Sequence, residues 1–181
     1  IPGDPLNIAL IGTEAEVVAI LQAAHWVRAR PLGLRSDFTL AEATLLKRPD
    51  DDAPVSSLYL FGRQEDLAFE QPVGHDPRQR HHVRFWRTPQ LGPDERPLWV
   101  GAATYDKGVG LSHDTGQITH HIDGDIDAER DHILQTLVDT DQLELHFLKP
   151  DFHQELSGRN GGGDRWFTDG ALAVGLIADS D

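Results

Sequence analysis

A succession of short apolar segments between Ser57 and Ile122 constrains the fold of this 181-residue chain more than any other feature. The segments are rich in β-branched and aromatic residues, and Gly, Pro, Asp and Gln separate one from the next. Consecutive strands with short connections usually pair antiparallel. We therefore predict an antiparallel sheet with strands in SLYLFG (57–62), DLAFEQP (66–72), HHVRFWRT (81–88), PLWVGAATYD (97–106) and QITHHI (117–122).

Helix signals lie on both sides of this region. The segments TEAE (13–16) and TLAE (39–42) both match the capping box, so we predict one helix over about 13–26 and a second that ends before Pro49. A third helix is predicted in DIDAERDHILQTLVDT (125–140), where apolar residues recur at helical spacing after an acidic first turn.

Further strands are predicted in LNIALIG (6–12), in LELHFLK (143–149) and in two apolar runs joined by Asp169-Gly170, a dipeptide suited to a tight hairpin turn. Together these elements indicate an α+β fold, a mostly antiparallel sheet with about three helices packed on one sheet face. A doubly wound α/β fold is the weaker interpretation, because strand and helix do not alternate in the middle of the chain. The length fits one domain over residues 1–181.

Composition restricts the classes of function. The formal net charge of -14 disfavours general affinity for nucleic acids or anionic membrane surfaces. No run approaches the roughly eighteen apolar residues of a membrane-spanning helix, so we expect a soluble chain. Cysteine is absent, and any metal would need His, Asp, Glu or carbonyl ligands. The chain contains no Met and begins IPGDPLN, from which we expect a fragment of a longer protein.

Two histidine pairs, His81–His82 and His120–His121, lie in predicted strands. Neighbouring strand residues face opposite sides, so at most one histidine of each pair can reach a shared site. If the two strands are neighbours, His82 (or His81), His121 and Asp123 would form a site for a divalent metal such as zinc or manganese. Exposed sheet histidines that pair with carboxylates are the alternative.

The segment GRNGGGDRWFTDG (158–170) contains a second candidate site. Successive glycines can present backbone N–H groups as a nest for an anion, and two arginines flank them. We expect a small phosphate or carboxylate ligand to bind there, at Arg159, Asn160, Gly161, Gly162, Gly163 and Arg165. The segment is not a GxxxxGK[ST] phosphate-binding loop, and a tightly turned surface loop is the alternative.

Two aspartates are candidate catalytic residues. Asp106 ends a predicted strand, and Asp164 follows the glycines. Either carboxylate would act as a general base on a water that a metal at the histidine site activates. A serine hydrolase is disfavoured, because no GxSxG segment is present and the adjacent Ser112 and His113 would not point toward one another.

Several long phrases resemble the LssY C-terminal domain family: PVSSLYLFGRQEDLAFEQPVG, RQRHHVRFWRTP, PLWVGAATYDKGVGLSHDTGQITHHID, DAERDHI and RNGGGDRWFTDG. The resemblance extends from about Asp4 to Ile177. It implies a bacterial soluble module attached to membrane-embedded segments of a longer protein, often ones that resemble type 2 phosphatidic-acid phosphatases or DedA-like proteins. It brings no established activity and no catalytic residues.

Two functional hypotheses follow. The first is an accessory or binding domain of a bacterial membrane-associated protein, which recognises an anionic, phosphate-bearing headgroup or a protein partner. The second is a metal-dependent hydrolase or phosphoesterase with a His/Asp site. We expect no nucleic acid partner, and we expect membrane association only through other segments of the parent protein.

Overall fold

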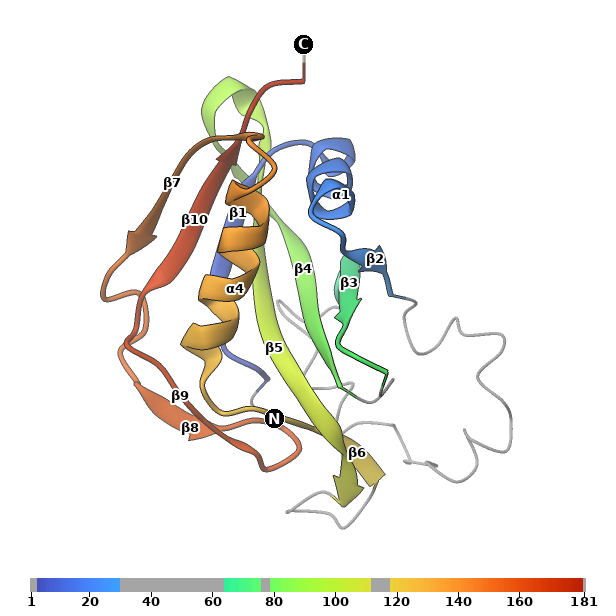
Figure 1. Ribbon diagram of the computed structural model, residues 1–181. Helices are drawn as coiled ribbons and strands as arrows, with labels where there is room; N and C mark the ends of the chain where they lie inside the picture. The colour runs from blue at the N-terminus through green and yellow to red at the C-terminus, as the bar shows by residue number, and fades with distance from the viewer. Residues whose placement is uncertain (1–2, 30–63, 76–78, 112–117, 181) are drawn as a thin grey trace.

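A computed structural model describes residues 3–29, 64–75, 79–111 and 118–180 (Figure 1). Within these residues the α-helices are α1 (Glu14–Ala23) and α4 (Ile126–Val138), and a short 3-10 helix spans Pro93–Glu95. The strands are β1 (Ile8–Ile11), β2 (Val27–Arg28), β3 (Leu67–Pro72), β4 (Arg80–Leu91), β5 (Pro97–Leu111), β6 (Ile118–Ile122), β7 (Leu143–Lys149), β8 (Ser157–Arg159), β9 (Arg165–Phe167) and β10 (Leu172–Ile177).

Eight strands form one sheet in the order β2-β3-β4-β5-β1-β10-β7, and β6 pairs with β5 outside this path. Among the described strands of this sheet, β1 and β10 run parallel and the other pairs are antiparallel, which confirms the mostly antiparallel sheet. Asp106 of β5 pairs with Arg80 of β4 and with Ile122 of β6. Because a strand has two edges, β4 and β6 lie on opposite sides of β5.

Local capping explains where both described helices begin. Thr13 Oγ1 accepts the N–H of Glu16 at 3.1 Å, and Glu16 Oε1 accepts the N–H of Thr13 at 2.8 Å, as the capping box requires. At α4, Asp125 Oδ1 accepts the N–H of Ala128 at 3.1 Å. These helices confirm two of the predictions, whereas the helix predicted from residue 39 and the strand predicted over 57–62 lie outside the described residues.

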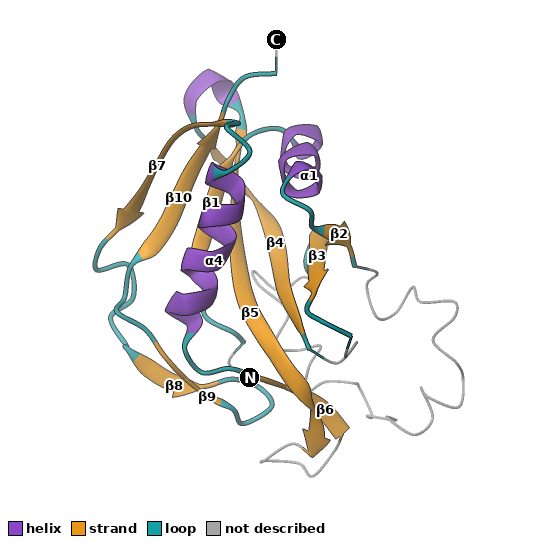
Figure 2. Cartoon of the chain, viewed as in Figure 1, coloured by secondary structure: helices purple, strands orange, loops and turns teal. Residues whose placement is uncertain are grey.

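Both described helices cover the same face of the sheet (Figure 2). Their apolar side chains meet sheet side chains in one core, whose large members include Val17, Ile20, Leu21, Phe69, Phe85, Trp99, Ile133 and Leu137. A smaller apolar cluster lies on the other face, with Ala9, Trp86, Val100, Ala102, Leu172 and Val174. The prediction that helices pack on one face is therefore confirmed for the two described helices.

The hairpin predicted across Asp169-Gly170 is wrong. β9 pairs with β8 through the glycine-rich loop, while β10 lies between β1 and β7 in the large sheet. All six residues of β10 are buried, as is usual for a strand with neighbours on both edges. Gly170 has a φ of 91°, so it adopts the left-handed conformation where the chain leaves the small β8–β9 sheet for the large one.

Candidate functional site

An open pocket of about 420 Å³ lies where the β8–β9 hairpin approaches the ends of β5 and β6. Figure 1 shows these elements together at one end of the molecule. Gly124 packs against the hairpin backbone there, and it has no room for a side chain because a Cβ would lie 2.7 Å from the carbonyl oxygen of Arg165. The pocket is lined by Lys107, Ile122, Gly124, Arg159, Gly163, Asp164 and Arg165.

Positive charge dominates the pocket wall. Lys107, Arg159 and Arg165 are exposed, and no ion pair joins them to a carboxylate in the part of the chain that the structure describes. Arg159 and Arg165 lie directly opposite one another in the β8–β9 ladder. Like charges at opposed positions destabilise a strand pair, so this arrangement favours an anion between them. Lys107 was not among the predicted site residues, since it is remote from the hairpin in sequence.

Asn160 holds the loop between β8 and β9. Its Oδ1 accepts the N–H groups of Gly162 and Asp164 at 3.0 and 2.9 Å, and its carbonyl oxygen accepts the N–H of Gly163 at 3.0 Å. The nest predicted from consecutive glycines does not form from these three amides, because they bond within the loop. Anion binding by this loop stays a prediction, and it now depends on the side chains of Arg159 and Arg165.

Asp164 is the acidic member of the pocket wall, and its carboxylate is engaged. Oδ1 lies 2.7 Å from His121 Nδ1, and Oδ2 accepts the N–H of Ile122 at 3.1 Å. Both contacts orient the carboxylate toward β6. A role of Asp164 as a general base stays a prediction, and the imidazole–carboxylate pair places His121 beside the pocket.

Asp106 lies in a buried, charged region next to this pair. Its Oδ2 accepts a hydrogen bond from Arg80 Nε at 3.2 Å. Burial raises the pKa of Asp106, and the positive charges of Arg84 and Arg80 oppose the rise. The Asp106 carboxyl group is thus held by the charges of Arg80 and Arg84 on β4.

Asp4, which the sequence did not single out, connects the two candidate aspartates. Asn160 Nδ2 donates to Asp4 Oδ1 at 3.1 Å, and Arg84 Nη1 lies 3.7 Å from Oδ2. Burial raises the pKa of Asp4, Arg84 and Asn160 oppose the rise, and the negative charges of Asp106 and Asp164 add to it. The three carboxylates are therefore close enough to interact electrostatically, a relation that no spacing in the sequence indicates.

The predicted metal ligands His82, His121 and Asp123 are not brought together. β5 separates the strands of the two histidines, and His82 lies opposite Thr104 whereas His121 lies opposite Gly108, so their backbones are well over about 10 Å apart. Asp123 is exposed, and its Oδ1 accepts the N–H of Asp125 at 2.9 Å. Among the described residues, no group of three or more His, Asp or Glu side chains is arranged to hold a metal ion.

A family model for the LssY C-terminus matches residues 1–172. The chain belongs to the LssY C-terminus family. No curated protein and no solved structure shows significant similarity to it. Neither of the helices described in this LssY C-terminus domain is both long and apolar enough to cross a membrane.

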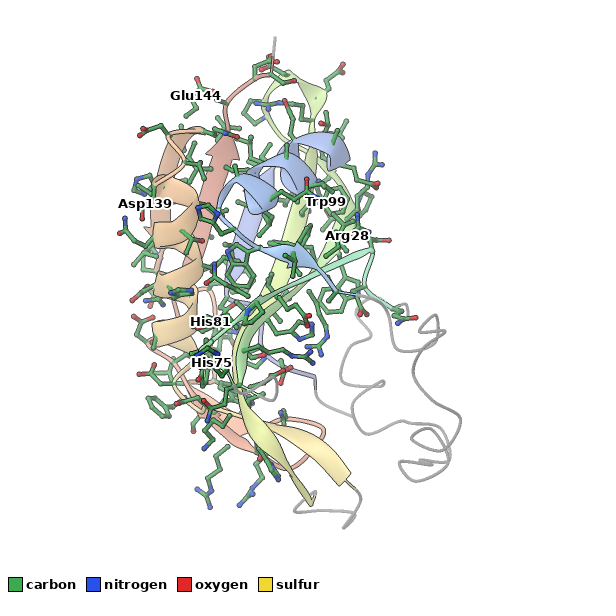
Figure 3. All side chains as sticks on the ribbon, turned by 45° about the vertical axis from the view of Figure 1, so that its right-hand side comes forward. Arg28, His75, His81, Trp99, Asp139 and Glu144 are labelled. Atoms are coloured by element: carbon green, nitrogen blue, oxygen red, sulfur yellow. The ribbon has the colours of Figure 1, made fainter. Side chains whose placement is uncertain are left out.

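A second polar cluster of the LssY C-terminus domain lies between α4 and the sheet. His81 Nδ1 is 2.7 Å from Glu129 Oε2, and the rings of His81 and His132 stack with centroids 3.8 Å apart and 17° between their planes. His132 Nε2 is 2.9 Å from Gln71 Oε1. Figure 3 shows His81 beside α4. Nitrogen lone pairs lie in the ring planes, so stacked rings cannot both point at one metal ion. The cluster instead holds α4 against β3 and β4.

Proposed function

We propose that this domain is an accessory binding module that recognises a phosphate-bearing anion in the pocket between β5 and the β8–β9 hairpin. The observation that carries the proposal is the gathering of Lys107, Arg159 and Arg165 at one pocket, in a chain whose net charge is -14. Cationic side chains are scarce in such a chain. Three that converge without an ion pair among the described residues favour a ligand of opposite charge.

The chemistry of the three groups suits phosphate. A guanidinium presents paired N–H donors that match two phosphate oxygens, and Lys107 adds a compact charge. Arg159 Nη1 donates to the carbonyl oxygen of Gly163 at 2.9 Å, which orients this side chain over the loop. Asp164 opposes an anion by its charge, but His121 and the amide of Ile122 already take up its oxygens.

Other segments of the parent protein would bring a phosphate-bearing ligand near this domain. The family resemblance implies membrane-embedded segments elsewhere in the parent protein, and a headgroup-like anion is a ligand that such segments would bring near the domain. The overall negative charge would hold the free domain away from an anionic surface, so a tether would supply the proximity. Recognition of a single group in a pocket is compatible with that charge, because at about 0.15 M salt charges are screened beyond about 8 Å.

Titration of the domain with inorganic phosphate tests the proposal. We expect saturable binding by calorimetry, with amide chemical-shift changes concentrated at residues 163–165. Arg165→Gln should weaken binding at least about tenfold, which is the size of one lost charge-assisted hydrogen bond. Arg28→Gln is the matched control, because Arg28 is an exposed arginine on the edge strand β2, which β3 and β4 separate from β5.

Two results would refute anion recognition: no saturable binding of phosphate by the wild-type domain, or an equal loss of phosphate affinity in Arg165→Gln and Arg28→Gln. The metal-dependent hydrolase has no comparable support, since the described residues do not gather the ligands it needs.

A further inference from the structure

One large apolar side chain stands beside the cationic pocket. Phe167 follows Arg165 by two residues on β9, so both side chains project from the same face of the hairpin. The Phe167 side chain is among the exposed large hydrophobic groups, with 55% of its surface accessible. The two arginines and an exposed phenyl group therefore occupy one face of the β8–β9 hairpin.

Contacts with Gly124 place this phenyl group at the pocket rim. Gly124 lines the pocket, and the N–H of Phe167 donates to the Gly124 carbonyl oxygen at 2.9 Å. A Cβ at Gly124 would lie 3.6 Å from Phe167 Cε1. The absence of a side chain at Gly124 lets β9 pack this closely, and Ile122 adds an apolar residue to the pocket lining.

The packing of the hairpin itself uses the opposite face. Trp166 projects there and lies against Gly158, where a Cβ would come within 2.7 Å of the indole. Directly across from Phe167 on β8 is Ser157, a small residue that covers little of a phenyl ring. The exposed ring is thus not explained by the core of the hairpin, and it lies next to Gly124, which lines the cationic pocket.

We propose that the ligand of this pocket is a phosphomonoester with an apolar organic group, whose phosphate lies between Arg159 and Arg165 and whose organic group packs on Phe167. This inference rests on the proposed anion recognition and adds the class of ligand. Three cations suit the double charge of a monoester better than the single charge of a phosphodiester or a carboxylate. Phe167 is then a specificity-determining residue and not a phosphate ligand.

Comparison of two soluble probes tests the inference. Phenyl phosphate should bind the wild-type domain roughly fivefold more tightly than inorganic phosphate, from one aromatic contact. Phe167→Ser should remove this difference and leave the affinity for inorganic phosphate unchanged, while Phe167→Leu should retain part of it. Phe147→Ser is the matched control, because Phe147 is a phenylalanine with 48% of its surface exposed on β7, in a different strand.

The outcomes separate the two proposals. Equal affinity of the wild-type domain for both probes, or an unchanged preference in Phe167→Ser, would overturn the apolar-group inference and leave phosphate recognition standing. Failure of both probes to bind the wild-type domain would remove the proposed function as well. The wild-type comparison does not depend on any variant folding correctly.

Sedimentation with vesicles identifies the source of the monoester. Binding to phosphatidylcholine vesicles only when they contain phosphatidic acid, and its loss in Phe167→Ser, would support a lipid monoester. Preference for phenyl phosphate without vesicle binding would support a soluble monoester. Binding to pure phosphatidylcholine vesicles that survives Arg165→Gln would indicate apolar adsorption and contradict the assignment.

Discussion

Replacing Glu16 with glutamine removes one charge from a buried junction between α1, the residue before β5 and the end of the chain. Glu16 Oε1 accepts from the N–H of Thr13 at 2.8 Å and from Arg96 Nη1 at 3.0 Å, and Oε2 accepts the N–H of Ser180 at 3.1 Å. Burial alone would raise the pKa of Glu16, but these hydrogen bonds outweigh it and lower the pKa from 4.5 to about 2. The carboxylate is thus strongly favoured in the folded state.

The difference of about 2.5 between these pKa values sets the size of the effect. At about 1.36 kcal/mol per pH unit, it corresponds to about 3 kcal/mol of folding free energy at neutral pH. Because the folded pKa lies below the unfolded value, this stability is present above about pH 4.5 and is lost as the pH falls toward 2. Glu16→Gln should therefore lose about 3 kcal/mol at pH 7, since it leaves buried Arg96 without this carboxylate.

Urea denaturation of the wild-type domain and of Glu16→Gln at several pH values checks this prediction. Glu14→Gln is the control, because Glu14 is an exposed acid in the same first turn and should change stability little. The difference in free energy of unfolding between wild type and Glu16→Gln should shrink as the pH is lowered, because protonation of Glu16 removes the same charge from wild type. The reasoning would be refuted if the two free energies of unfolding differed by less than about 1 kcal/mol at pH 7, or if their difference did not change with pH.

Two further predictions concern the polar clusters. Burial and, to a smaller extent, the charge of His81 lower the pKa of His132 below 6.5, and the charge of Glu129 opposes this shift. The folded state therefore favours neutral His132, and the stability of the domain should decrease as the pH falls below about 6.5. His132→Gln should flatten the dependence of Tm on pH below that value, and an unchanged slope would contradict this. Asn160→Ala loses three side-chain hydrogen bonds, at about 1 kcal/mol each, and should lower both the free energy of unfolding and the affinity for phosphate. Unaltered phosphate affinity in this variant would show that Asn160 does not position the pocket.

Local signals in the sequence were accurate where neighbouring residues alone decide the structure. Thr13 and Asp125 cap their helices because a side-chain oxygen reaches an N–H group a few residues away. The apolar segments bounded by Gly, Pro, Asp and Gln predicted β4, β5 and β6, although β5 continues to Leu111, beyond its predicted end at Asp106. The prediction of a hairpin at Asp169-Gly170 was wrong because neighbouring residues do not decide the structure there. The same dipeptide also suits a link between two sheets.

The candidate site was predicted only in parts. Arg159 and Arg165 were recognised because they flank a distinctive loop, and the structure adds their direct opposition across β8 and β9. Lys107 reaches the same pocket from β5, although more than fifty positions separate it from Arg159. The supposed metal ligands were assigned on the assumption that their two strands are neighbours, and the insertion of β5 between them removed that basis.

The sequence by itself determined the α+β class, the helix starts and the family, because capping, periodicity and long shared phrases depend on residues that are close along the chain. Tertiary structure decided the order of the strands, and with it which charged groups meet. Lys107, Arg159 and Arg165 share a pocket, Asp4 feels the negative charges of both Asp106 and Asp164, and β5 separates His82 from His121. Contacts between distant segments follow from burial of the two apolar faces of the sheet, a property of the whole chain that no single motif expresses.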